Sequence, residues 1–134
     1  MNEAEKKQLV SVLADGEMPV SAGRVKLKVS AGVVHIRFCS TNLQNHLQYK
    51  FNINKNTLSA DFELWICGSN DQWYLLSMSV IRELHEHPDA YEDYQHPGLT
   101  VVSVNINKNE VLYARGGISE DIGKYYKAKF AQLA

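Results

Sequence analysis

Apolar and polar residues alternate along two neighbouring segments near the start of the chain. Over residues 24–29 valine and leucine alternate with arginine and lysine, and over 34–38 valine, isoleucine and phenylalanine alternate with histidine and arginine. Successive side chains of a strand point to opposite faces of a sheet, so a period of two predicts strands with one buried face. The intervening Ser30-Ala31-Gly32 favours a turn, and the two segments are expected to form a hairpin.

The longest alternating pattern occupies the middle of the chain. Apolar residues recur at every second position over most of 47–53 and 58–66, and Asn54-Lys55-Asn56 suits a turn because asparagine tolerates a left-handed backbone. We expect a long hairpin with one buried face, which Ile122 and Phe130 cover. The residues expected on that face are Tyr49, Phe51, Ile53, Phe62, Leu64 and Ile66.

Two further strands are predicted in the second half of the chain. One runs from residue 73 to about 80, and residues 81–85 after it are expected to form a short helical turn. The other covers 99–106, which is rich in β-branched residues, and it continues through a turn at 107–109 into a strand at 111–114. These segments add another hairpin to the expected sheet.

A helix is predicted at each end of the chain. Asn2 suits an N-cap with Glu5 three residues later, as in a capping box. Ser119 is expected to cap the last helix, whose apolar stripe should pack on the sheet. That stripe comprises Ile122, Tyr125, Tyr126, Phe130 and Leu133.

These elements predict one α+β domain over residues 1–134. An antiparallel or mixed β-sheet of about six strands in hairpins would be flanked by the N-terminal and the C-terminal helix. The pattern does not give the order of the strands.

Composition and charge narrow the classes of function. The chain has 14 Lys and Arg against 15 Asp and Glu, so no global field attracts nucleic acid or an anionic membrane, and any such partner must bind a local patch. No apolar run is long enough to span a bilayer, and no membrane partner is expected. Only two cysteines, Cys39 and Cys67, indicate reduced thiols and a cytoplasmic location.

Four segments in the middle third of the chain, at residues 34–40, 49–53, 61–62 and 73–76, carry a family likeness. The chain resembles there the PD-(D/E)xK nuclease superfamily, nearest to its small intron-associated endonuclease-like members. In that family one strand carries an acid or Gln, one further residue and then Lys, and the preceding strand carries an Asp. The resemblance implies that the acids hold Mg²⁺ and that the Lys positions the attacking water.

The chain departs from that pattern at each catalytic position. His35 replaces the metal-binding acid or Gln, Arg37 replaces the Lys, and the strand before them offers Lys26 and Lys28 instead of Asp. A guanidinium that stays protonated cannot act as a base, and ammonium groups repel a cation. The resemblance therefore implies a nuclease-like scaffold without its hydrolytic site. A mixed sheet with a parallel pair of strands would support it, whereas a pure meander would not.

Acidic and histidine-rich positions give weaker signals. Asp61 and Glu63 share a strand face, where a solvated surface beside Lys50 is favoured over a metal site completed by Glu92 or Asp93. The segment 85–96 is expected to be a loop and contains several potential metal ligands, namely His85, His87, His96, Asp89, Glu92 and Asp93. Exposed loop histidines are favoured there over a metal site. Arg115-Gly116-Gly117 could receive an anion, although an ordinary connection is favoured.

Basic residues on the first hairpin carry the functional hypothesis. Arg24, Lys26, Lys28 and Arg37 are expected to alternate outward and to contact nucleic acid. The favoured function is a non-catalytic binding module for DNA or a DNA-processing protein, with no catalytic residue, metal or cofactor, and a homodimer is left open. The first alternative is an adaptor or inhibitor that binds protein through aromatics such as Trp65 and Trp73. The second is a metal-dependent nuclease.

Overall fold

The computed structural model describes residues 1–40, 48–54, 58–88, 90, 95, 97–113 and 120–133. Within these residues the chain is an α+β protein with two β-sheets and two α-helices, α1 (Glu3–Leu13) and α2 (Met78–Glu86). The α+β class is therefore confirmed, but the strands form two sheets instead of one.

Sheet A is mixed and contains the predicted N-terminal hairpin. Its strands, in spatial order, are β1 (Val20–Ser21), β2 (Lys26–Val29), β3 (Gly32–Cys39), β5 (Phe62–Cys67) and β6 (Trp73–Ser77). The β2–β3 hairpin is confirmed, β3 and β5 are parallel, and the other neighbours are antiparallel.

Sheet B is antiparallel and contains the hairpin predicted over residues 99–114. In spatial order it comprises β4 (Gln48–Asn54), β7 (Leu99–Asn105), β8 (Glu110–Tyr113) and β9 (Glu120–Asp121). The turn between β7 and β8 is fixed by Asn105, whose Oδ1 accepts hydrogen bonds from the backbone N–H groups of Asn107 and Lys108. This hairpin is therefore confirmed.

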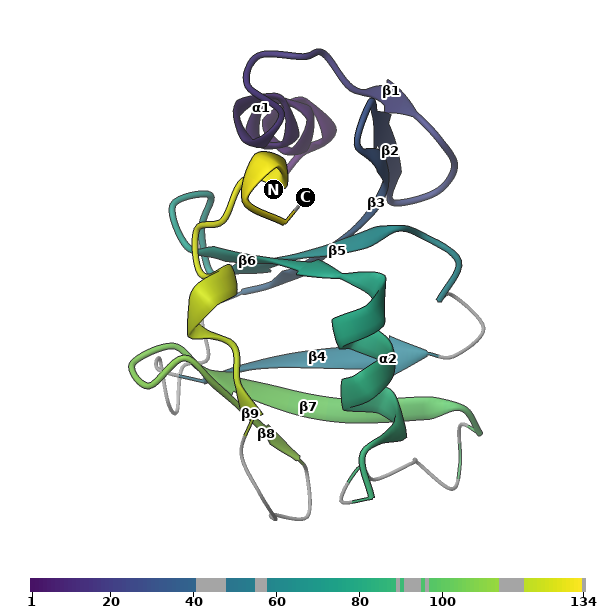
Figure 1. The fold of residues 1–134 in the computed structure, drawn as a ribbon, viewed down its shortest axis with the longest axis vertical. Coiled ribbons are helices and arrows are strands. Elements are labelled where there is room, and N and C mark those ends of the chain that lie inside the picture. The colour runs from purple at the N-terminus through teal and green to yellow at the C-terminus, as the bar shows by residue number, and fades with distance from the viewer. Residues whose placement is uncertain are drawn as a thin grey trace.

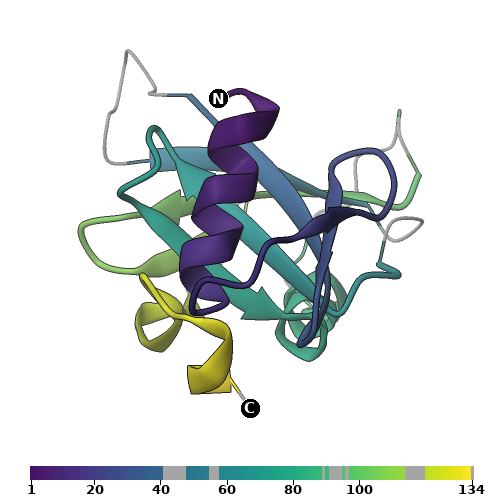
Figure 2. The same cartoon turned by 90° about the horizontal axis from the view of Figure 1, so that it is seen from above.

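The elements stack in layers, with sheet A in the middle (Figure 1). Helix α1 crosses the outer face of sheet A (Figure 2), and the short 3-10 helix η3 (Phe130–Leu133) lies beside it. Sheet B faces the other side of sheet A, and α2 runs alongside the two sheets. Two hydrophobic cores result. The outer core lies between α1, η3 and sheet A, and the inner core lies between the two sheets and α2.

Helix α1 begins as its sequence predicts. The side chain of Asn2 accepts a hydrogen bond of 2.8 Å from the backbone N–H of Glu5, which satisfies one of the free donors of the first turn. Leu9, Val10 and Leu13 are buried in the outer core. In the described residues no helix is long and apolar enough to cross a membrane.

The long hairpin predicted over 47–66 is wrong. β4 pairs with β7, and β5 pairs with β3 and β6, so the two halves of the expected hairpin belong to different sheets. All six residues expected on its buried face are at least partly buried, but they are divided between the cores. Tyr49, Phe51 and Ile53 lie in the inner core, whereas Leu64 and Ile66 lie in the outer core with Phe62 against it. The predicted turn at 55–57 lies outside the described residues.

The predicted C-terminal α-helix is also wrong. Instead the chain forms β9, the 3-10 helix η2 (Gly123–Tyr125) and η3. Ile122 is buried in the inner core and Phe130 in the outer core, on opposite sides of sheet A. A single straight helix has one apolar face and packs it against one side of a sheet, so it could not contribute to both cores. The chain turns at Lys127, which has a φ of 52° and donates its N–H to the carbonyl of Trp73 at the edge of β6.

The predicted strand from 73 to about 80 ends earlier, because α2 already begins at Met78. Met78, Ile81 and Leu84 follow a helical spacing and face the inner core. The helical turn expected at 81–85 is thus part of a longer helix.

Candidate nucleic-acid interface

The inner face of the β2–β3 hairpin gathers the polar residues singled out in the sequence. Lys26 lies opposite His35 in the antiparallel register, and Arg37 follows His35 by two residues on the same face. Leu27 and Val29 point the other way, into the outer core. The apolar alternation therefore fixes Lys26, Lys28, His35 and Arg37 on the face of sheet A that looks toward sheet B.

A cleft of about 310 Å³ lies where this face meets β4. β4 is the terminal strand of sheet B within the described residues. It contacts β3, so it covers part of the face of β3 that looks toward sheet B. Val25, His35 and Arg37 line the cleft from sheet A, and Lys50 and Asn52 line it from β4. Ile36, Phe38 and Phe51 complete the lining, so the cleft is bordered by both polar and apolar side chains from two sheets.

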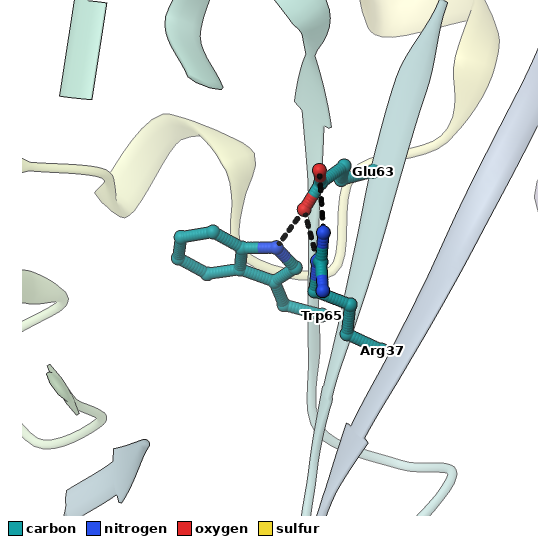
Figure 3. A network of polar contacts seen from close by, with 3 residues as sticks. All are labelled: Arg37, Glu63 and Trp65. Carbon is teal, nitrogen blue, oxygen red and sulfur yellow. Dashed lines mark hydrogen bonds and ion pairs between the residues drawn. The ribbon is translucent and has the colours of Figure 1, made fainter. Parts of the chain in front are cut away.

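Next to this cleft the partly exposed Arg37 forms an ion pair with the buried Glu63 (Figure 3). Arg37 Nε donates to Glu63 Oε1 at 2.8 Å, and Arg37 Nη2 donates to Oε2 at 3.4 Å. Trp65 Nε1 donates to Oε1 at 2.7 Å, and the Trp65 ring stacks on Phe51 of sheet B with centroids 4.8 Å apart. Glu63 is 0% exposed, so its carboxylate is sealed under sheet B with its charge balanced by the guanidinium.

The four residues predicted to bind nucleic acid have different environments. Arg24 and Lys28 are exposed. Lys26 is half-buried, and its Nζ donates a hydrogen bond of 3.0 Å to Ser59 Oγ. Arg37 has its charge compensated by Glu63, whereas among the described residues no acidic side chain forms an ion pair with Arg24, Lys26 or Lys28.

Lys50 was missed as a member of this cluster. The sequence places it on the polar side of a strand, which is correct, because Tyr49 and Phe51 on either side are buried. Its position next to β3 depends on how sheet B packs on sheet A. No local pattern in the sequence encodes that packing.

Val25 joins the two strands of this site in a strained conformation. Its φ is 52°, which is rare for a β-branched residue, and its carbonyl accepts a hydrogen bond of 2.9 Å from the backbone N–H of Ile36. Strain of this kind persists where the surrounding structure fixes the backbone, and it is frequent at binding sites. Arg24 directly precedes Val25 and is exposed. Val25 itself lines the cleft.

Asp61 and Glu63 do not form the solvated acidic face that was favoured. Glu63 is buried, whereas Asp61 is exposed and its Oδ2 accepts a hydrogen bond of 2.8 Å from the backbone N–H of Val33. Lys50 belongs to the other sheet. The expectation is wrong because β5 is a central strand with both faces covered.

The histidine-rich segment is described only in part. His87 Nε2 lies 3.2 Å from Glu120 Oε1, and His85 Nε2 lies 3.3 Å from the carbonyl oxygen of Gly98. The other members of the predicted groups, His96, Asp89, Glu92, Asp93 and Arg115-Gly116-Gly117, lie outside the described residues. Over the described part of the chain, no group of three or more His, Cys, Asp or Glu side chains is arranged to hold a metal ion.

The two tryptophans proposed as a protein-binding surface belong to the cores. Trp65 is 0% exposed, and Trp73 packs against the outer core and donates its Nε1–H to the carbonyl of Ala128 at 3.1 Å. Trp65 therefore offers no surface to a partner, whereas Trp73 is partly exposed and lines a hollow of about 530 Å³ beside α1.

Searches against protein-family models, curated proteins and solved structures find no match to this chain.

Proposed function

We propose that this chain is a non-catalytic module that binds the phosphate backbone of DNA. The binding surface is the basic corner, which we define as Arg24, Lys26, Lys28 and Lys50. The observation that carries the proposal is that Lys50 lines the cleft from sheet B, while Arg24 and Lys26 flank Val25, which lines it from the other side, in a chain whose formal net charge is −1. Lys28 lies on the same strand, β2, two residues from Lys26. Phosphate contacts of this kind supply affinity without reading the base sequence.

The arrangement of sheet A supports a nuclease-like scaffold. β3 and β5 are a parallel pair within a mixed sheet that α1 flanks, which is the arrangement that the resemblance implies. His35 and Arg37 lie on β3 of that pair, and Lys26 and Lys28 lie on the strand before it. On this scaffold the positions that would hold Mg²⁺ carry basic or neutral side chains.

The state of Glu63 supports a non-catalytic role. Its carboxylate accepts hydrogen bonds from Arg37 and Trp65, and it is closed off from solvent. A metal ion at this carboxylate would have to displace the guanidinium, and the like charges would repel each other in a medium of low dielectric constant. The same ion pair leaves the surface charge to Lys50 and the hairpin lysines.

The test is a fluorescence titration of a labelled DNA duplex at several salt concentrations. Four phosphate contacts predict a slope of log affinity against log salt near about −3.6, from roughly −0.9 for each contact. The double variant Lys26→Gln/Lys28→Gln should reduce the slope to about −1.8 and weaken binding at low salt. The duplex should stay intact when Mg²⁺ is added.

The matched control is Lys124→Gln/Lys129→Gln, which removes two exposed positive charges from the C-terminal segment. It should leave the slope nearly unchanged. Absence of binding to the wild-type protein at low salt would refute the proposal, and so would an equal loss of affinity in the control. The adaptor hypothesis would then be favoured, with its surface at the edge strand β1, where Val20 and the nearby Met18 are exposed.

A further inference from the structure

Cys39 and Cys67 are direct neighbours across the parallel pair of strands β3 and β5. They are partners in the register, at the last position of each strand. The backbone N–H of Gly68 donates a hydrogen bond of 2.8 Å to the carbonyl of Cys39, which keeps the two strand ends together. Neighbouring strands are about 4.8 Å apart, within the range of about 4.4–6.8 Å between Cα atoms that disulfides span.

Both side chains lie on the same face of sheet A. Cys67 belongs to the inner core, and Cys39 packs against that core. The alternation along the strands agrees, because Trp65 and Cys67 point inward together. Both cysteines are free thiols. We propose that they form a reversible intramolecular disulfide by exchange with a low-molecular-weight disulfide.

Exposure sets the order of the two exchange steps. Cys39 is partly exposed, whereas Cys67 is fully buried. The Cys39 thiolate attacks one sulfur of oxidised glutathione, forms a mixed disulfide and releases one glutathione thiolate, which takes up a proton. The Cys67 thiolate then attacks Cys39 Sγ and displaces the second glutathione, which is protonated in turn. Two protein thiols are thereby oxidised while one glutathione disulfide is reduced to two thiols.

The second step is the slow one. Burial, followed by the nearby Cys39, raises the pKa of the Cys67 thiol to about 12. Capping of Cys39 as a mixed disulfide removes the negative charge that would oppose ionisation of Cys67. Ring closure is favoured by the adjacent positions of the two sulfurs.

This inference is independent of DNA binding and is tested on the folded protein with oxidised glutathione as the probe. Mass spectrometry of the wild-type protein should show a monomer that has lost two hydrogen atoms, and its digest should contain a Cys39–Cys67 cross-linked peptide. The melting temperature should rise by several degrees on oxidation, because the bond closes the chain segment that contains β4. Dithiothreitol should reverse both changes.

Single variants separate the two steps. Cys67→Ala should stop at a stable adduct of one glutathione on Cys39, and Cys39→Ala should react only after the protein is unfolded. A wild-type protein that keeps the glutathione adduct on Cys39, or that forms a disulfide-linked dimer instead, would overturn the inference. It would also be overturned by a wild-type protein that does not react when folded although both thiols react in denaturant.

Discussion

The ion pair of Arg37 and Glu63 places a charged carboxylate in the interior of the fold, which costs free energy of hydration. A carboxylate removed from water loses several kcal/mol of hydration, and its partner must compensate for this through Coulomb attraction and hydrogen bonds. Here the guanidinium and the indole N–H together provide three contacts to one buried carboxylate. A variant that removes only one partner should therefore lose more stability than a variant that replaces both partners by apolar residues.

We expect Arg37→Ala to lower the free energy of unfolding by about 3–5 kcal/mol, because it leaves the carboxylate of Glu63 buried without its counter-ion. The double variant Arg37→Met/Glu63→Leu should lose less stability than Arg37→Ala. Urea unfolding followed by circular dichroism measures both. The matched control is Lys129→Ala, which removes an exposed ion pair with Asp15 (Nζ to Oδ1 3.7 Å) and should cost less than about 1 kcal/mol. Equal losses for Arg37→Ala and Lys129→Ala would contradict the expectation.

The sequence could predict the face on which Arg37 and Glu63 lie, but not their burial. Alternation places each of them opposite to Ile36 and Leu64, and both of these contact the outer core. Arg37 and Glu63 lie on the other face of sheet A. Whether that face is exposed to solvent depends on whether sheet B covers it, and the covering strands lie within residues 48–54 and 99–113. The same limit explains why Lys50 was not assigned to the basic corner.

Among the elements, those whose pairing is local in sequence follow their patterns most closely. The hairpins β2–β3 and β7–β8 have short turns, and their registers follow from the turn and the apolar positions. The segment after β3 instead crosses to sheet B before it returns as β5, parallel to β3. A turn signal such as Asn54-Lys55-Asn56 cannot distinguish this crossover from a hairpin, since both need the chain to leave a strand.

The turn of the β2–β3 hairpin offers a test at the level of one element. Gly32 has a φ of 146°, and a Cβ atom added there would lie 2.6 Å from Oδ2 of Asp61. Gly23, in the turn before β2, has a φ of 127°, but an added Cβ would meet no atom within 4 Å. Both substitutions to alanine strain the backbone, and only the one at Gly32 also displaces the carboxylate that binds the Val33 N–H.

We expect Gly23→Ala to cost about 1–2 kcal/mol and Gly32→Ala to cost at least about 1 kcal/mol more. Chemical unfolding of the two variants gives the difference directly. Gly32→Ala should remain the more destabilising of the two whether or not Cys39 and Cys67 are oxidised, since no cysteine atom is among the nearest neighbours of either glycine. If both variants lost the same stability, Asp61 would not be fixed by the turn.

At the scale of the whole molecule, sheet A belongs to both cores. β5 supplies Leu64 and Ile66 to the outer core and Trp65 and Cys67 to the inner core, and β6 likewise contributes to both cores. The C-terminal segment connects the same two cores around the edge of β6, from Ile122 to Phe130. The folded chain should therefore lose both cores together, although they lie on opposite sides of a sheet.

The two tryptophans report on the two cores separately, because Trp65 lies in the inner core and Trp73 packs against the outer one. In Trp73→Phe the fluorescence of Trp65 follows the inner core, and in Trp65→Phe that of Trp73 follows the outer core. Within each variant we expect the urea midpoint from fluorescence to coincide with that from far-ultraviolet circular dichroism, as in a two-state transition. Each variant serves as its own reference, since loss of an indole hydrogen bond changes the midpoint of both signals equally. An outer core that melts before the circular dichroism changes would mean that α1 and the C-terminal segment detach while sheets A and B remain folded.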